Sequence, residues 1–346
     1  MALAIPTRIP WPARFDGVVV GVIAVLAVGA LAPSAGVWEP WEADQVAVVD
    51  QMHSTGQWLE VRLPTMGQKT RAVAELPYGW WPMAAFTAVL GTSELTLRLP
   101  GLLLGAAALW MLFAVARRFF GRAPAWYAVL ACISMPLWGF HTRFGLGQGV
   151  TMAFTAISAL AFLRVGADDE ASGGWRWTAW STLVPAALCG GVVGLLTPLV
   201  AGGAARLGKA PKEGLRPLLG LFRSRAAVAI AVGLIGLGWW RAAAHLGADS
   251  SLNALFFLTD GLGASPKGAD RPPFALFVHQ IGFGLFPLGA LLPFAFAALL
   301  WGGPHDDDSP ASAAVIAGAT AWVVFEFDQA VSVCQFRMCR GPRCGS

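Results

Sequence analysis

Long apolar stretches, most of them close to twenty residues, recur along this chain and are separated by shorter segments that carry most of its charge. A helix of roughly 20 apolar residues crosses the hydrocarbon core of a bilayer, which is about 30 Å thick. Hydrophobic residues make up 56% of the chain, charged residues 13%, and the mean hydropathy is +0.60, unlike a soluble domain. Because backbone groups in lipid need internal hydrogen bonds, we expect an all-α, polytopic transmembrane helical bundle.

The basic residues between the apolar stretches indicate how the spans are oriented. Arg8 and Arg14 precede the first span, which predicts a cytoplasmic N-terminus. The stretch 177–205 begins and ends at segments that both need to face the cytoplasm, so we expect a helical hairpin with its turn at Cys189-Gly190-Gly191. The expected single spans are about 17–32, 100–116, 124–140, 150–165, 226–244, 274–301 and 311–325.

A long polar segment, 38–99, follows the first span and is expected outside the membrane. It is crowded with carboxylates, tryptophans and prolines, and a loop of this length is usually functional. Within it, 42–53 and 78–90 are too short to span and are predicted to be interfacial helices. We expect residues 1–325 to form the transmembrane domain, with 326–346 as a tail of different composition for which disorder is one interpretation.

The composition also argues against several classes of function. The net charge is +4 and the isoelectric point is about 9.0, but membrane topology alone explains the basic residues, so no nucleic-acid partner is expected. The five cysteines lack the spacing of zinc ligands, and no glycine-rich phosphate loop joins a strand to a helix. No cofactor and no metal site is predicted. A requirement for a divalent metal ion is left open, but no residue pattern supports it.

Several short motifs follow one another along the first two thirds of the chain. They are Glu42-Ala43-Asp44 with Met52, Gly56 and Trp58; Glu75-Leu76-Pro77 with Trp80-Trp81; Arg98-Leu99-Pro100; Arg143 to Gln148; and 188–198. Their order resembles that of the polytopic GT-C glycosyltransferases, in particular the protein O-mannosyltransferase and aminoarabinose transferase (family 39-like) group. The chain departs from that pattern where Trp41, Leu76 and Gln148 replace an acid, a lysine and an aspartate, and it lacks later spans and a further domain, so it is expected to be a divergent and truncated relative.

The resemblance implies transfer of a sugar from a polyprenyl-phosphate donor to a lipid, glycan or protein hydroxyl at the outer face of a bacterial-type inner membrane. An inverting transfer needs a carboxylate that accepts the proton of the acceptor and cations that stabilise the departing phosphate. Glu42 and Asp44 are the candidate bases. Two plainer interpretations stay open for them, solvated loop acids and acids at a helix N-terminus.

Arg143 is the first candidate for the phosphate, because a guanidinium binds phosphate oxygens through paired donors, although snorkelling to lipid headgroups is the commoner role of such an arginine. Trp80 and Trp81 are candidates for stacking on sugar rings, but an interfacial tryptophan belt explains them as well. The remaining candidates for substrate binding are Lys69, Glu75, Arg98, Gln148 and His279, with an ion pair to Arg98 or Arg71 as the alternative for Glu75.

Two classes of function therefore compete. The first is a membrane glycosyltransferase, which the retained Glu42, Asp44, Glu75 and Arg143 favour. The second is a non-catalytic relative that binds lipid or acts as a scaffold, which Leu76 and Gln148 favour. A transporter is disfavoured, because the charges gather at the ends of the spans and not within them.

Overall fold

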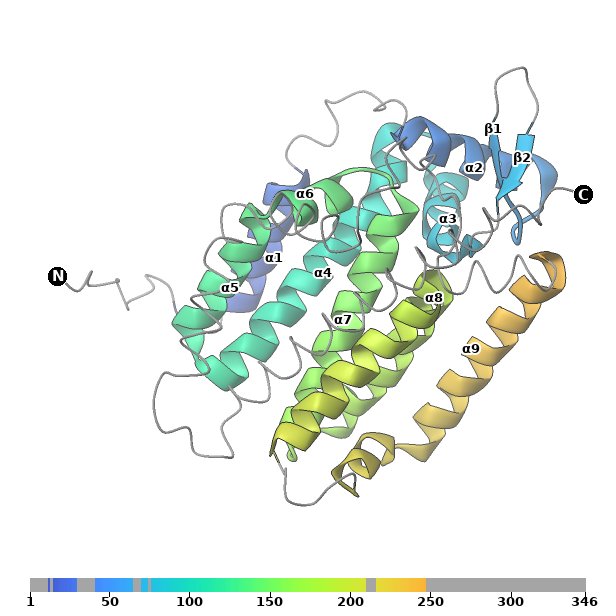
Figure 1. The fold of residues 1–346 in the computed structure, drawn as a ribbon. Coiled ribbons are helices and arrows are strands. Elements are labelled where there is room, and N and C mark those ends of the chain that lie inside the picture. The colour runs from blue at the N-terminus through green and yellow to red at the C-terminus, as the bar shows by residue number, and fades with distance from the viewer. Residues whose placement is uncertain are drawn as a thin grey trace, which may run out of the picture.

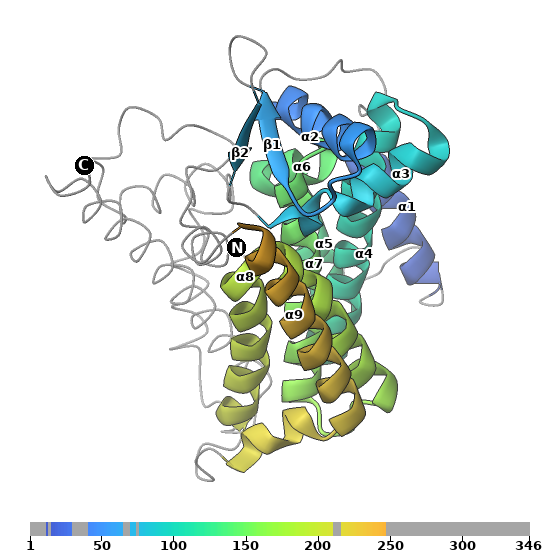
Figure 2. The same ribbon diagram turned by 90° about the vertical axis from the view of Figure 1, so that its right-hand side faces the viewer.

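The computed structural model describes residues 12, 15–29, 41–64, 70–73, 76–209 and 216–246. The long helices run side by side as a bundle, and shorter elements gather over one end of it (Figures 1 and 2). The chain is an integral membrane protein, and the predicted polytopic helical bundle is confirmed. Four helices in the described part are long and apolar enough to cross a membrane, namely α4 (Glu94–Phe120), α7 (Gly147–Ala167), α8 (Gly173–Lys209) and α9 (Arg225–Leu246).

Two shorter helices, α1 (Asp16–Gly29) and α5 (Arg122–Ser134), pack beside α4. The prediction of one continuous span over 124–140 is wrong. The helix stops at Met135, which has an extended backbone, and α6 (Pro136–Arg143) begins directly after it. Proline disfavours the helical conformation in the residue before it, so Pro136 breaks an apolar stretch that otherwise reads as one helix.

A cap of small elements covers the bundle at the end where α4 begins, and with α6 it forms what we call the loop end (Figure 1). The two predicted short helices are confirmed as α2 and α3, and their buried Met52 and Met83 pack with Leu97 of α4. The two-stranded antiparallel sheet, with Val61 opposite Val73, was not predicted. The elements are α2 (Trp41–Thr55), β1 (Val61–Pro64), β2 (Thr70–Val73), the 3-10 helix η2 (Pro77–Gly79) and α3 (Trp81–Leu90).

The predicted hairpin is confirmed in α8. Gly191 has φ 51° and ψ −138°, a conformation that few residues other than glycine adopt, and it reverses the chain between two helical limbs. The limbs lie so close that a Cβ at Gly194 would meet the carbonyl of Ala186. Each limb has about 18 residues and a length of roughly 27 Å, close to the thickness of a hydrocarbon core.

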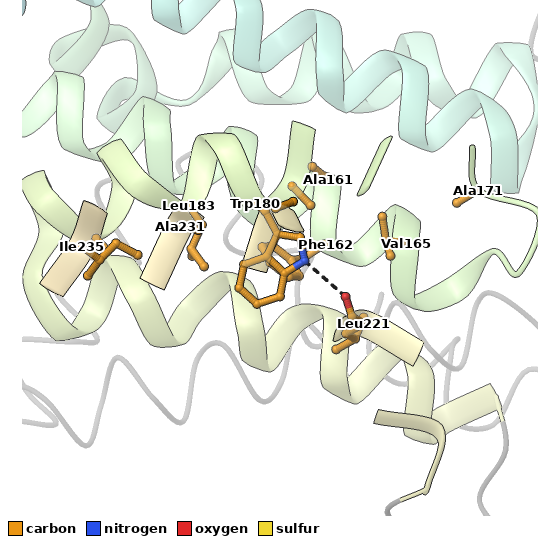
Figure 3. Packing of buried hydrophobic residues seen from close by; sticks show 12 residues of the cluster. Ala161, Phe162, Val165, Ala171, Trp180, Leu183, Leu221, Ala231 and Ile235 are labelled. Atoms are coloured by element: carbon orange, nitrogen blue, oxygen red, sulfur yellow. Dashed lines mark hydrogen bonds between the residues drawn. The ribbon is translucent and has the colours of Figure 1, made fainter. Parts of the chain in front are cut away.

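The largest core cluster joins α7 to α8, α9 and the 3-10 helix η4 (Arg216–Phe222) (Figure 3). Phe162 is fully buried and meets the Trp180 ring edge-on, with 5.2 Å between the ring centroids. A Cβ at Gly202 would lie 3.0 Å from the Phe162 side chain, so this one ring contacts both limbs of α8. Burying an aromatic side chain of this size fixes the hairpin against α7.

Ion pairs close the opposite end of the bundle, which we call the arginine end. Asp16 is fully buried and pairs with Arg117 and Arg122, and this links the start of α1 to the junction between α4 and α5. The other pairs at the arginine end are Asp168 with Arg118 and Arg164, Glu170 with Arg118, and Asp169 with Arg206. The predicted spans at 274–301 and 311–325 and the tail at 326–346 lie outside the described residues.

Candidate functional site

The first turn of α2 carries Glu42 into the protein interior, where it meets Arg98 from the first turns of α4. Both side chains are 1% exposed, and the guanidinium donates two hydrogen bonds, from Nε to Oε1 at 2.8 Å and from Nη2 to Oε2 at 2.6 Å. Oε1 also accepts the backbone N–H of Gly145 at 2.8 Å. This two-point arrangement ties α2, α4 and the loop between α6 and α7 together.

A second contact of the same kind lies one helical turn further along α2. Gln45 is 4% exposed, and its Oε1 accepts the indole N–H of Trp80 at 2.7 Å and the backbone N–H of Gly147 at 3.1 Å. Gln45 was not predicted as a site residue. Its signal was the spacing, because Glu42 and Gln45 are three residues apart on one helix face, and Gly145 and Gly147, whose N–H groups they accept, are two residues apart where the loop enters α7.

Asp44 lies between these two anchors but points elsewhere. Its side chain is half-buried and forms no hydrogen bond or ion pair with any other residue that the structure describes. Burial raises the pKa of Asp44 above its ordinary value of 3.8. A partly desolvated carboxylate without a cationic partner is the state that suits a general base.

Arg143 ends α6 at the same end of the bundle. Its Nη2 donates to the carbonyl of Ala27 in the last turn of α1 at 2.6 Å, which is the helix end where a cation is favourable. Its Nε is buried and has no partner within the described part. Gln148, in the first turn of α7, is exposed and follows the Gly147 that Gln45 holds.

The predicted aromatic residues occupy two different environments. Trp80 is 4% exposed and belongs to the apolar core between α2, α3 and α4. Trp81 is 38% exposed, donates its indole N–H to the carbonyl of Trp58 at 2.8 Å and meets the Tyr78 ring edge-on. Of the two, only Trp81 offers part of its ring to a molecule outside the protein.

Leu76, which stands where the resemblance places a lysine, is buried in an apolar cluster with Tyr78 and Cys189. Cys189 comes from the tip of the α8 hairpin, and the Tyr78 hydroxyl donates to the carbonyl of Gly238 in α9 at 2.6 Å. The position therefore connects the cap to α8 and α9 through apolar packing and contributes no cation.

Three predicted site residues, Lys69, Glu75 and His279, lie outside the described residues. Within the part of the chain that the structure describes, no group of three or more His, Cys, Asp or Glu side chains lies close enough to hold a metal ion. The described site thus offers a carboxylate in Asp44, a cation in Arg143, an amide in Gln148 and an aromatic face in Trp81, all at the loop end.

Comparisons with known proteins found one family and one solved protein that are similar to this chain. Residues 74–196 match the model of a family described as dolichyl-phosphate-mannose-protein mannosyltransferase. The fold is similar to that of ArnT from Cupriavidus metallidurans bound to undecaprenyl phosphate, with a TM-score of 0.69 and 17% identity over 93% of this chain. The apo structure of ArnT gives a TM-score of 0.68 and 19% identity, also over 93%. No curated protein matches the chain significantly in sequence.

The chain spans about three fifths of the length of the ArnT chains, of which it covers 59% and 58%. The predicted resemblance is nevertheless confirmed by two independent comparisons, one of sequence over the middle of the chain and one of fold over nearly all of it. The chain therefore shares the fold of ArnT, and its residues 74–196 match the dolichyl-phosphate-mannose-protein mannosyltransferase family model.

Proposed function

We propose that this protein is a membrane glycosyltransferase that takes a sugar from a polyprenyl-phosphate donor and transfers it, with inversion, to a hydroxyl acceptor at the outer face of a bacterial inner membrane. The observation that carries the proposal is the state of Asp44, a half-buried carboxylate free of ion pairs among the described residues, at the loop end of a fold shared with ArnT. The ArnT structure was determined with undecaprenyl phosphate bound, which supports a carrier of this class.

Asp44 suits the role of base better than Glu42, because both Glu42 oxygens already accept hydrogen bonds from Arg98. In the proposed step the acceptor oxygen forms a bond to the anomeric carbon of the sugar, and the bond from that carbon to the phosphate oxygen breaks. The acceptor proton passes to Asp44, and the electron pair leaves with the polyprenyl phosphate. A pKa above the ordinary aspartate value makes the carboxylate a stronger base for this proton.

Arg143 is proposed to stabilise the negative charge of the leaving phosphate. Its guanidinium is anchored at one nitrogen by Ala27, so it is held at the loop end with donors to spare. Gln148 and Trp81 are proposed to bind the sugar, the first through its amide and the second through its partly exposed ring. Arg98 is assigned a positioning role through Glu42.

A non-catalytic relative that binds the lipid carrier is the second candidate. The burial of Leu76 in an apolar cluster favours it, because the resemblance places a cation at that position. The two candidates share a lipid ligand and differ in whether a sugar is transferred.

The test combines a binding and a transfer measurement on the full chain reconstituted in liposomes. Undecaprenyl phosphate binding is measured by native mass spectrometry, and labelled polyprenyl-phosphate sugars are supplied with lipid, glycan and peptide acceptors. Binding with transfer is expected. Binding without transfer to any acceptor would favour the non-catalytic relative, and loss of both would overturn both candidates.

Arg143→Gln is expected to weaken undecaprenyl phosphate binding by about tenfold, since a charge-assisted hydrogen bond contributes roughly 1.5 kcal/mol or more. The matched control is Arg62→Gln, an arginine of the same end that is more than a third exposed and pairs with Glu60. Equal affinity in the two variants would remove Arg143 from the phosphate site.

A further inference from the structure

The 3-10 helix η4 lies at the arginine end, far along the bundle from the candidate site, and is visible as the yellow turn between α8 and α9 at the bottom of Figure 1. Two backbone carbonyls fix it to both limbs of the α8 hairpin. The carbonyl of Leu221 accepts the indole N–H of Trp180 at 3.2 Å (Figure 3), and that of Pro217 accepts Nε of Arg206 at 3.3 Å. Pro217 and Leu221 are themselves buried, so η4 is held rigidly.

Besides these buried residues, η4 exposes apolar side chains, although the Phe222 ring also packs against Trp180, with 5.5 Å between the ring centroids. Leu219 is 73% exposed and Phe222 is 44% exposed, although they flank the buried Leu221. Two large apolar side chains on a fixed surface next to the ends of membrane spans are typical of an element that lies in the interfacial region of a bilayer.

Three exposed arginines, Arg216, Arg223 and Arg225, surround these apolar side chains. None of the three forms an ion pair with another residue in the described ranges. In this they differ from Arg117 and Arg122 at the same end, which both pair with the buried Asp16. The three charges around η4 thus face outward without a counter-charge from the described residues.

We propose that η4 and the start of α9 form a binding surface for anionic phospholipids. Arg216, Arg223 and Arg225 would contact headgroup phosphates, while Leu219 and Phe222 enter the boundary between headgroups and acyl chains. Topology alone explains arginines at this end, but not the exposed apolar side chains that the fold holds among them. Each basic residue near an anionic membrane surface contributes about 1 kcal/mol, which corresponds to about a fivefold change in affinity.

The experiment uses the full chain in nanodiscs of phosphatidylglycerol and phosphatidylcholine, with the lipids retained on the protein counted by native mass spectrometry. The wild type is expected to enrich phosphatidylglycerol. The variant R216Q/R223Q/R225Q is expected to lose most of that enrichment, about fivefold for each arginine removed. The corresponding triple lysine variant keeps the charge and is expected to keep the enrichment, which separates lipid attraction from a structural role of the guanidinium groups.

A matched control lies on the same helix, since Arg241 is an exposed arginine near the other end of α9. Arg241→Gln is expected to leave the enrichment unchanged, whereas Arg225→Gln alone lowers it. The comparison of Arg241→Gln with Arg225→Gln still tests the proposal if the triple glutamine variant fails to fold. The proposal is overturned if the triple glutamine variant retains phosphatidylglycerol as the wild type does, or if Arg241→Gln and Arg225→Gln lower the enrichment equally. Because the readout is lipid retention, it does not depend on the proposed sugar transfer.

Discussion

Arg98 donates hydrogen bonds to both carboxylate oxygens of Glu42, which lies 56 residues earlier in the sequence, and both side chains are 1% exposed. Taking two charges out of water costs several kcal/mol for each ion, so the pair exists only because both partners are in place. This relationship fixes the first turn of α2, and with it Asp44, against the start of α4.

Removing one partner of that pair is therefore expected to be costly. Glu42→Gln keeps an acceptor for the N–H of Gly145 but deprives Arg98 of its closest carboxylate, and we expect a loss of about 3–5 kcal/mol in the free energy of unfolding. Arg98→Met is expected to lose a similar amount. The double variant Glu42→Gln/Arg98→Met should recover most of it, measured by chemical unfolding in detergent micelles. Additive losses in the double variant would show that the pair does not act as a unit.

The Oε1 of Gln45 accepts the indole N–H of Trp80 and the backbone N–H of Gly147. Among the described residues, neither N–H group has another acceptor. Gln45→Leu leaves the indole of Trp80 and the N–H of Gly147 without this acceptor, and a loss of about 1–3 kcal/mol in unfolding free energy is expected. Gln51→Leu, on the same helix, is the control, because the buried Oε1 of Gln51 has no partner in the described part. A Gln45→Leu variant as stable as the control would refute the anchoring role.

Asp168 is expected to make the stability of the fold depend on pH in the acidic range. Burial raises its pKa, but the hydrogen bonds from Arg118 and from the N–H of Glu170, with the nearby charge of Arg164, together hold the pKa below the ordinary value of 3.8. A carboxyl group with a lowered pKa stabilises the folded state above about pH 4, and this contribution disappears as the pH falls through its folded pKa. Melting temperatures measured from pH 7 down to pH 3 should therefore fall more steeply in the wild type than in Asp168→Asn.

The control for that series is Glu170→Gln. Glu170 is 89% exposed and lies 3.9 Å from Arg118, so its loss should change the melting temperature very little. If Asp168→Asn follows the same pH dependence as the wild type, the ion pairs of Asp168 do not contribute to stability.

The parts of the fold that sequence could predict are those that depend on local pattern. The spans of α4, α7 and α9 follow long apolar stretches. The hairpin in α8 follows because the charged segments before and after it are expected on the same side of the membrane and glycine stands at the turn. The break before Pro136 was missed because the apolar pattern continues across it. The β1–β2 pair was missed because each strand has only four residues, the shortest run over which alternation indicates a strand.

Pairings between distant residues could not be predicted. Asp16 and Arg122 are 106 residues apart, and only the packing of α1 beside α5 brings them together. In the candidate site, Glu42, Asp44, Arg98 and Arg143 were proposed from motif order. Nothing local indicates that Glu42 has an ion pair while Asp44 forms none with the residues that the structure describes. Gln45 was missed for the same reason, since its partners lie just before α3 and at the start of α7.

The assignment of Asp44 predicts a separation between activity and stability. Burial raises its pKa, so ionisation of Asp44 is less favourable in the folded protein than in the unfolded chain and destabilises the fold above its folded pKa. Asp44→Asn removes that charge, and its melting temperature at pH 7 is expected not to fall below that of the wild type. Asp50→Asn, an exposed position on the same helix, is the control for both properties.

The most direct measurement is the transfer of a labelled sugar from polyprenyl phosphate by the reconstituted full chain, with Asp44→Asn and Asp50→Asn compared side by side. The proposed mechanism predicts transfer by the wild type and by Asp50→Asn, and a loss of at least a hundredfold in Asp44→Asn while that variant still binds undecaprenyl phosphate. Undiminished transfer by Asp44→Asn would contradict the assignment of the base, and the absence of transfer by the wild type with every donor and acceptor would contradict the proposed enzyme.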